Sequence, residues 1–150
     1  MPLTVRKANI DDLSKTFKWA NEREVIKSSI ERSKKVEMNE HSVWFKKYIS
    51  LKSSYLFIAS LKSEKIGLVR IDCKKKEIFL SYLVDRKKRN KGFGYQMLNK
   101  IIKKFKNKKQ VFKARVKRNN LPSNSIFIKL GFKVIYTNQN KNTFLYRLVN

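Results

Sequence analysis

The chain has 150 residues, of which 37 are Lys or Arg and 11 are Asp or Glu, giving a formal net charge of +26 at pH 7. A charge of this size is typical of disordered basic tails, but 12% aromatic and 41% hydrophobic residues supply enough apolar side chains for a packed core. The length is that of one domain, so we expect a single compact basic domain over residues 1–150.

Simple counts also exclude several kinds of chemistry. No stretch approaches the roughly 18 consecutive apolar residues of a membrane span, and Met1–Arg6 lacks the apolar segment of a signal peptide. We therefore expect a cytoplasmic protein without membrane contact. One His and one Cys cannot supply a common structural metal site, and the lone Cys73 cannot form an internal disulfide. We expect no metal and no redox chemistry.

The charge is concentrated toward the C-terminus. Every acidic residue lies at or before Asp85, whereas residues 86–150 hold 19 Lys and Arg residues and no acid. This half should attract anions. Compositional drift toward Lys, Asn and Ile would produce the same excess, so the charge alone identifies no partner.

The first half of the chain combines short β patterns with amphipathic helices. Leu3–Arg6 is predicted as a strand, and Asn9 or Asp11 can cap a helix that ends near Asn21. Asn39 can cap a second helix, because apolar residues recur at helical spacing after it. Three successive segments rich in β-branched and aromatic residues are then predicted as strands: Tyr55–Ala59, Ile66–Ile71 and Ile78–Val84.

In the second half, a basic loop leads into a helix, a strand, another helix and a hairpin. We expect the loop at residues 86–91 and the helix after Gly94. The strand is expected at Val111–Arg118, the second helix at Pro122–Leu130, and the strands of the hairpin at Phe132–Tyr136 and Phe144–Val149. The order predicts a mixed α/β fold, a twisted sheet of six to seven strands flanked by helices on both faces. The strand before the loop, the helix and the next strand form a crossover unit, and ligands in such sheets favour the carboxyl ends of the strands.

The loop at the start of that helix is the strongest candidate for a binding site. It reads Arg89-Asn90-Lys91-Gly92-Phe93-Gly94 and stands between a strand and a helix, so its N–H groups and the helix N-terminus favour an anion at one point. Gly92 and Gly94 let the main chain approach closely. The pattern R-x-x-G-x-G is weak by itself, since two glycines before a helix can form only a turn.

Two segments together resemble the GNAT superfamily of acyl-CoA-dependent N-acyltransferases. Residues 89–94 are similar to the family signature Q/R-x-x-G-x-G/A, and Asn120-Leu121-Pro122-Ser123 followed by Gly131-Phe132 is similar to its second element, at the expected separation. The resemblance covers essentially the whole chain and implies the GNAT fold, with acetyl-CoA as acyl donor.

The resemblance also implies where the donor binds. The backbone of Leu83 and Val84 would pair with the pantetheine arm, and the pyrophosphate would lie on residues 89–94. Asn120 would bind the pantetheine or phosphate portion, whereas Ser123 and Phe127 would border the thioester. A helix cap is the alternative role for Asn120, and a core position the alternative for Phe127.

The N-terminal half carries a narrower resemblance. Trp19, Asn21, Ser29, His41 and Trp44 follow a pattern similar to that of bacterial GNATs that acetylate nucleotide-linked amino sugars in pseudaminic acid, legionaminic acid and other surface-polysaccharide pathways. It implies that these five residues bind a small-molecule amino-sugar substrate. Many members carry Arg where this chain has Ala20, so one substrate contact is absent, and either Trp could instead belong to the core.

The catalytic groups follow less directly from the sequence. His41 lies in the first turn of a predicted helix, whose dipole disfavours the imidazolium, so a neutral imidazole can act as a base or bind the substrate. The resemblance implies a water-relayed base at Glu77, for which an exposed strand-end carboxylate is the alternative. The Tyr that usually acts as general acid is replaced by Phe127, which leaves Tyr82, Tyr136, Ser123 or solvent to protonate the thiolate.

We therefore expect an N-acetyltransferase of an amino sugar, acting by direct transfer as a monomer or homodimer. The lone Cys73 falls in a predicted lysine-rich turn without a neighbouring His, which disfavours a covalent enzyme. Acetylation of a protein N-terminus, polyamine or aminoglycoside is the enzymatic alternative. A nucleic-acid-binding domain is the alternative of another class, disfavoured because no recognised motif with interleaved aromatics is present.

Overall fold

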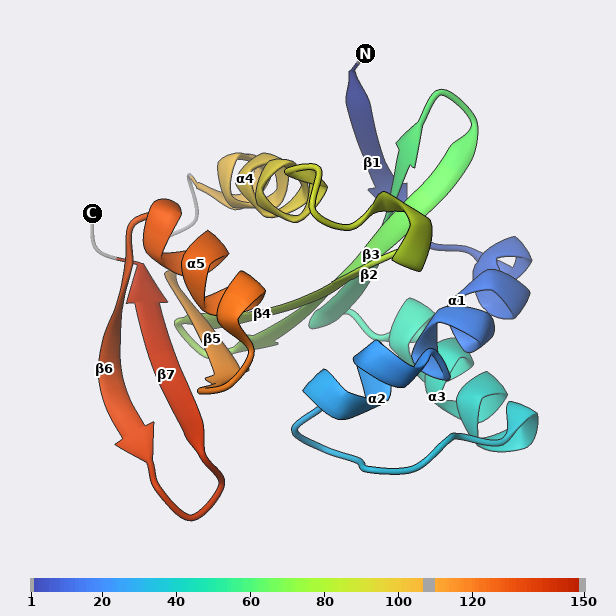
Figure 1. The fold of residues 1–150 in the computed structure, drawn as a ribbon. Helices are drawn as coiled ribbons and strands as arrows, with labels where there is room; N and C mark the ends of the chain where they lie inside the picture. The colour runs from blue at the N-terminus through green and yellow to red at the C-terminus, as the bar shows by residue number, and fades with distance from the viewer. Residues whose placement is uncertain (1, 107–109, 149–150) are drawn as a thin grey trace.

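A computed structural model describes residues 2–106 and 110–148 of the chain. Its elements alternate between strands and helices in the predicted order, with one helix more than expected (Figure 1). In chain order they are β1 (Leu3–Lys7), the 3₁₀ helix η1 (Ile10–Asp12), α1 (Leu13–Ala20), α2 (Arg23–Ser28), α3 (Met38–Ser50), β2 (Ser54–Leu61), β3 (Glu64–Lys74), β4 (Glu77–Val84), the 3₁₀ helix η2 (Arg86–Lys88), α4 (Phe93–Phe105), β5 (Val111–Lys117), α5 (Leu121–Lys129), β6 (Phe132–Asn138) and β7 (Thr143–Leu148).

The described strands form one seven-stranded sheet in the order β1-β2-β3-β4-β5-β7-β6. Neighbouring strands are antiparallel except β4 and β5, which are parallel and joined by α4. A parallel pair needs a crossover connection, and α4 supplies it. The predicted mixed α/β sheet and its crossover unit are confirmed.

Helices cover both faces of the sheet, and alternation along β2 shows how. Leu56 and Ile58 join the core cluster that contains Trp19 of α1 and Phe45 of α3. The intervening Phe57 and Ala59 join the larger cluster that holds the apolar side of α4. Because successive side chains of a strand point to opposite faces, β2 links a core under α1 and α3 to a core under α4 and α5.

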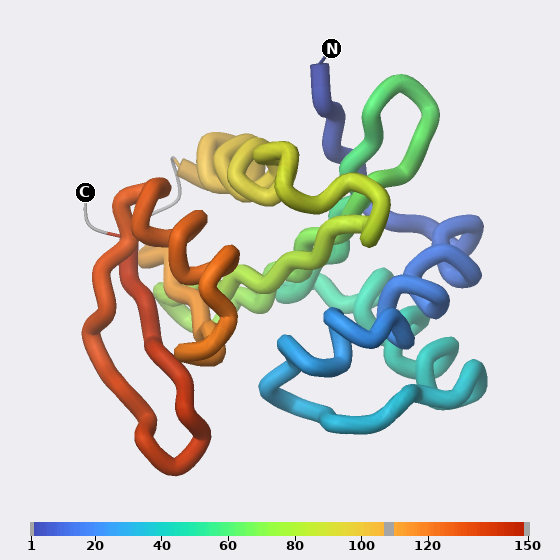
Figure 2. The backbone as a smooth tube through the Cα atoms, in the orientation of Figure 1, coloured from blue at the N-terminus to red at the C-terminus, as the bar shows by residue number. Residues whose placement is uncertain are grey.

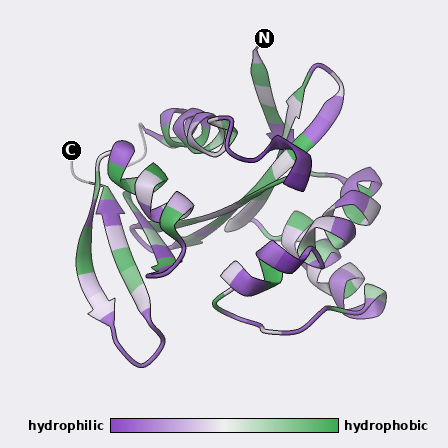
Figure 3. Cartoon of the chain, viewed as in Figure 1, coloured by the Kyte–Doolittle hydropathy of each residue, from purple (hydrophilic) through white to green (hydrophobic). Residues whose placement is uncertain are grey.

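The amphipathic pattern of α4 places its apolar side on the sheet. Met97, Leu98 and Ile101 are fully buried, whereas the lysines of the helix are exposed. The ribbon of α4 accordingly carries both hydrophobic and hydrophilic stretches (Figure 3). The basic segment before the helix is hydrophilic throughout. No helix in the described part of the chain has both the length and the apolar character needed to cross a membrane.

Several local predictions were wrong or incomplete. The short α2 was not predicted, because six residues with two adjacent apolar side chains carry no helical period. Glu37, not Asn39, occupies the N-cap of α3. Cys73 lies within β3, since that strand continues to Lys74 and the turn follows it. Asn9, one of the two proposed caps, caps η1, which leads directly into α1, whereas Asp12 occupies the N-cap of α1 itself. Val149 of the predicted last strand lies outside the described residues.

Candidate active site

The parallel strands β4 and β5 diverge halfway along, and this opens the sheet. Pairing between them is confined to Glu77–Phe79 with Val111–Lys113, after which β5 continues along β7. On the other side, β4 pairs with β3 over its full length. From Leu80 onward, β4 therefore presents an open backbone edge to the gap. A ligand or another chain can form hydrogen bonds there with the N–H and C=O groups of β4.

The register identifies the backbone groups that face this gap. Asp85 N donates to Ile66 O, so the peptide groups of odd-numbered β4 residues point to β3 and those of even-numbered residues point away from it. Tyr82 and Val84 therefore face the gap, and the backbone of Leu83 faces β3. This corrects the expectation that Leu83 would pair with a ligand through its backbone, although its side chain lines the adjacent cleft.

The segment after β4 forms a tight turn at the N-terminus of α4. Asp85 caps η2 by accepting a hydrogen bond from Lys87 N at 3.0 Å. Asn90 and Gly92 adopt positive φ angles of 61° and 84°, which turn the chain into the N-terminus of α4. The first N–H groups of this 13-residue helix have no partner within it, so they and the helix dipole favour a bound anion. Lys91 and Gly92 are exposed at this point.

The two glycines of the turn have different reasons to be glycine. A Cβ at Gly92 would meet nothing within 4 Å, so the backbone conformation, not space, requires glycine there. A Cβ at Gly94 would lie 2.9 Å from Ile126 Cδ1 and 3.0 Å from the ring of Tyr82, so that glycine allows α4 to pack closely against α5 and β4.

Arg89 does not extend freely toward the turn. Its Nε donates to Val84 O at 3.0 Å, and its guanidinium lies 3.6 Å from the carboxylate of Glu22. Arg89 therefore holds the end of β4 against the start of α2, and the backbone of the turn with Lys91 is left to contact an anion.

The second motif places two side chains beside the gap. Asn120 is the N-cap of α5, where its Oδ1 accepts from Ser123 N at 3.3 Å. Ser123 Oγ lies 2.7 Å from the hydroxyl of Tyr82, and burial raises the pKa of Tyr82 above its usual range. Tyr82 therefore stays protonated near neutral pH and can donate a proton or a hydrogen bond.

Phe127 adds no polar group to this hydroxyl pair. It is 2% exposed and packs between Phe132 and Tyr146, at centroid distances of 5.1 and 5.8 Å. Phe127 thus belongs to the core, so it does not border the thioester as expected. Tyr136, another proposed acid, is 59% exposed on β6 and does not line the cleft.

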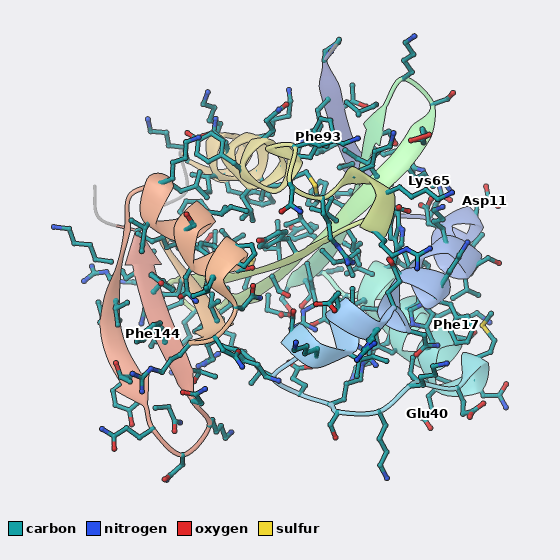
Figure 4. The ribbon with its side chains drawn as sticks, in the orientation of Figure 1. Asp11, Phe17, Glu40, Lys65, Phe93 and Phe144 are labelled. Carbon is teal, nitrogen blue, oxygen red and sulfur yellow. The ribbon has the colours of Figure 1, made fainter. Side chains whose placement is uncertain are left out.

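A cleft of about 1270 Å³ connects the gap with the helices on the opposite side. Phe93 at the start of α4 and Glu40 on α3 lie on its two sides (Figure 4). Ser29, His41 and Trp44 also line it. The cleft therefore brings together the turn at α4, the hydroxyl pair and part of the predicted substrate set.

His41 is buried against the cleft and held in a defined tautomer. Thr16 Oγ1 donates to Leu13 O at 3.0 Å and lies 2.9 Å from His41 Nε2. Because the single hydroxyl proton points to Leu13, the oxygen accepts from Nε2–H, which leaves Nδ1 as the acceptor nitrogen. Burial and the positive charge of Arg32 lower the pKa of His41 below its usual range. The imidazole is therefore neutral at pH 7.

Trp19 and Asn21 hold the walls of the cleft instead of lining it. Trp19 is 1% exposed, and its Nε1 donates to Asp85 Oδ2 at 2.7 Å, tying α1 to the end of β4. The amide of Asn21 donates to Val36 O at 2.9 Å and accepts from Val36 N at 2.8 Å. Asn21 thereby holds the open loop between α2 and α3 (Figure 2). The predicted substrate contacts of both residues are replaced by these positioning roles.

Glu77 lies at the wrong end of β4 for a base. It forms an ion pair with Lys113 at the start of the strand and does not line the cleft. Seven residues separate it from Val84, a distance of roughly 23 Å along an extended strand. The structure thus assigns Glu77 to pairing with β5.

Sequence reasoning missed a set of charged side chains in the cleft. Arg70 contacts Glu31 at 3.2 Å and Asp72 at 3.3 Å, and the carboxylate of Asp72 also accepts hydrogen bonds from Tyr48 and Ser54. Other carboxylates of the cleft are those of Glu24 and Glu40. The alternation of polar residues along β3 could have indicated that Arg70 and Asp72 share one face.

Comparison with known families decides what kind of site this is. The family described as the acetyltransferase (GNAT) domain matches residues 2–133. The chain belongs to the GNAT acetyltransferase family. It is an N-acetyltransferase with acetyl-CoA as its acyl donor. No curated protein matches this GNAT sequence.

Solved structures support the fold of this GNAT domain. A ribosomal L7/L12 alpha-N-protein acetyltransferase superposes with a TM-score of 0.86 at 13% identity, covering 99% of this chain and 90% of the other. Spermidine N-acetyltransferase from Vibrio cholerae gives 0.82 at 16% identity, covering 97% and 92%. The aminoglycoside acetyltransferase AAC(6')-Ib gives 0.84 at 16% identity, covering 98% and 92%. At these identities the likeness shows the GNAT fold alone.

The residues of the GNAT domain fit acetyl-CoA. The open edge of β4 offers N–H and C=O groups to the amides of a pantetheine arm, and the turn at Gly92 offers N–H groups and positive charge to a pyrophosphate. When bound, acetyl-CoA supplies an activated acyl thioester. Among the described residues, no three His, Cys, Asp or Glu side chains are grouped so as to hold a metal.

Proposed function

We propose that the acyl acceptor is an amino sugar, nucleotide-linked, bound on the α1–α3 side of the cleft. One observation carries this proposal: the rings of His41 and Trp44 lie side by side on α3, with centroids 5.5 Å apart, and both line the cleft opposite the donor edge of β4. An aromatic face beside a polar ring nitrogen suits a sugar, which presents both C–H faces and hydroxyl groups.

The transfer needs a neutral amine, a stabilised oxyanion and a proton for the thiolate. The amine nitrogen attacks the thioester carbonyl, forming the C–N bond and breaking the C–S bond. His41 Nδ1 accepts the proton that the amine loses, and the hydroxyl of Tyr82 donates a proton to the thiolate. The N–H of Val84 faces the gap and stabilises the charge on the carbonyl oxygen. Cys73 lies outside the cleft, so the transfer is direct.

Cationic amines are a second candidate class, favoured by a separate observation. Glu24 and Glu40 line the cleft and take part in no ion pair within the described residues. Exposed carboxylates of this kind suit polyamines, aminoglycosides or a protein N-terminus, which are the substrates named for the structural relatives. Against this class stand the basic side chains of the same cleft, among them Lys27, Arg32 and Lys74.

A panel of acceptors separates the two classes. Purified protein is incubated with acetyl-CoA and a series of UDP-linked amino sugars, free amino sugars, spermidine, kanamycin and a short peptide, while release of free thiol is followed. Turnover on at least one amino sugar is expected. Turnover confined to the polyamine, aminoglycoside or peptide would transfer the proposal to the second class.

A pair of substitutions on α3 ties the acceptor to Trp44. Trp44→Ala should raise the KM for the amino sugar by about tenfold, because a stacked aromatic contact contributes roughly 1 kcal/mol or more. Val43→Ala is the matched control, since Val43 is the adjacent residue, is 70% exposed and does not line the cleft. An equal change in both variants would show that Trp44 acts through the stability of α3.

A further inference from the structure

Three side chains form an unusual basic group at the far end of the cleft, away from the donor turn. Phe79 of β4 lies between Lys74 of β3 and Arg115 of β5, and all three line the cleft. Arg115 Cζ lies 4.4 Å and Lys74 Nζ lies 5.6 Å from the centroid of the Phe79 ring. We call Lys74, Phe79 and Arg115 the cationic platform. Its two positive charges both lie over the same aromatic ring.

The neighbouring cations are neutralised, but those of the cationic platform are not. On the same sheet face, Arg70 is paired with Glu31 and Asp72, and Lys113 is paired with Glu77. No carboxylate lies within ion-pair distance of Lys74 or Arg115 among the residues that the structure describes. Two like charges on one ring repel each other, and a bound anion would remove that repulsion.

We propose that the cationic platform binds a phosphate group that the acceptor carries beyond its amino sugar. This proposal rests on the proposed function. The fork of an Arg guanidinium matches two phosphate oxygens, and Lys adds a mobile point charge, so the pair suits a phosphate ester better than a single carboxylate. A diphosphate, as in a nucleotide-linked sugar, would reach both cations.

The place of the platform separates acceptor phosphate from donor phosphate. Phe79 precedes Val84 by five residues, which is roughly 16 Å along β4, and the donor turn follows Val84. Phe79 also points to the α1–α3 face, because the buried residues of β4 that join the α4 core alternate with it. His41 and Trp44 belong to that same face, so an acceptor there can place its amine near the gap and its phosphate on the platform.

A kinetic experiment tests the platform with a matched control. Arg115→Gln and Lys74→Gln remove one charge each, and Arg118→Gln removes an arginine that lies over Phe144, outside the cleft. With a UDP-linked amino sugar, the first two variants should raise the acceptor KM about tenfold or more, the effect of losing one charge-assisted contact, with kcat and the KM for acetyl-CoA unchanged. With the free amino sugar they should change nothing. Equal losses on both acceptors would overturn the proposal.

A binding experiment does not depend on turnover, so it can fail or succeed separately from the proposed function. UDP is titrated calorimetrically into protein saturated with CoA, which occupies the donor turn. The wild type and Arg118→Gln should bind UDP, and Arg115→Gln should bind it at least about tenfold more weakly. A sugar 1-phosphate titrated in the same way shows whether a monophosphate is sufficient or a diphosphate is required. If either ligand binds the wild type more tightly than it binds Arg115→Gln, the result supports the platform.

Two results of that titration would overturn the inference. One is the absence of binding of both phosphate esters to the wild type. The other is equal affinity in Arg115→Gln and the wild type. A single-stranded oligonucleotide that binds with steep salt dependence, and is weakened equally by Arg115→Gln and Arg118→Gln, would show a diffuse nucleic-acid surface instead of a phosphate subsite.

Discussion

Replacing Tyr82 by Phe removes one hydroxyl and leaves the rest of the site in place. That hydroxyl lies 2.7 Å from Ser123 Oγ. The ring itself packs near Phe127, with centroids 6.1 Å apart, and stays in its position in the variant. The backbone of residue 82, which faces the gap, is unchanged. The substitution therefore separates proton donation from donor binding.

The expected losses of stability and of activity differ in size. One net hydrogen bond contributes about 1 kcal/mol to stability, which would lower Tm by about 2–4 °C in a chain of this length. Loss of a general acid lowers kcat by roughly 10²–10⁴-fold, or about 3–5 kcal/mol of transition-state stabilisation. Activity should therefore fall far more than folding stability does.

Thiol release at saturating acetyl-CoA, with the acceptor identified by the panel above, measures the effect. Because the pKa of Tyr82 is raised, wild-type kcat should not decline on the alkaline side until the pH exceeds about 10. Ser123→Ala serves as the comparison, since it removes the partner but keeps the donor. A Tyr82→Phe enzyme that retains more than half of the wild-type kcat would refute the role of this hydroxyl. If kcat instead falls by the expected 10²–10⁴-fold only in Ser123→Ala, the proton comes from the serine.

Three further substitutions test other parts of the site and the fold. His41→Gln should lower kcat about 100-fold. In the wild type, kcat/KM should decline on the acid side only below pH 6.5, because burial lowers the pKa of His41; a decline that begins above pH 7 would contradict this. Gly92→Ala, at φ 84° with open space around it, should raise the KM for acetyl-CoA about fivefold and leave kcat unchanged, since only the left-handed backbone is penalised by about 1 kcal/mol; an altered kcat alone would count against the donor turn. Asp12 is fully buried, and hydrogen bonds from Arg6, Lys65 and Asn9 N–H outweigh the effect of burial and hold its pKa well below the usual range. A group with a depressed pKa stabilises the fold above its unfolded pKa and loses this effect as the pH falls. Asp12→Asn should therefore lower the free energy of unfolding in urea by about 2 kcal/mol at pH 7 and by less below about pH 4. A loss that does not depend on pH would show that the charge of Asp12 is not what stabilises the fold.

The donor side of the site could be predicted because it depends on neighbours in sequence. A turn that needs positive φ at Gly92, an anion at a helix N-terminus and an Asn cap before α5 all arise within a few residues. The same is true of the strand alternation that buries one side of β5. Such patterns hold wherever the elements are finally packed.

The acceptor side could not be predicted in the same way. Trp19 and Trp44 are both aromatic residues on amphipathic helices, yet one is 1% exposed and bonded to Asp85, and the other lines the cleft. The family resemblance implied a base at Glu77, but Glu77 lies at the end of β4 that is distant from the gap. These outcomes depend on how α1 and α3 lie on the sheet, which no local pattern specifies.

The sequence alone determined that a chain of 150 residues with a charge of +26 forms a mixed α/β fold, and it predicted an anion site before α4. Only the tertiary structure decided where β4 and β5 part, which backbone groups of β4 are thereby left open, and which basic side chains lie over the same aromatic ring. Lys74 and Phe79 lie on adjacent strands of one hairpin, and Arg115 joins them from a distant part of the chain through the register of β4 with β5. Strand register is set by burial of a whole face at once, so it is the packed sheet that converts an excess of basic residues into a localised charge.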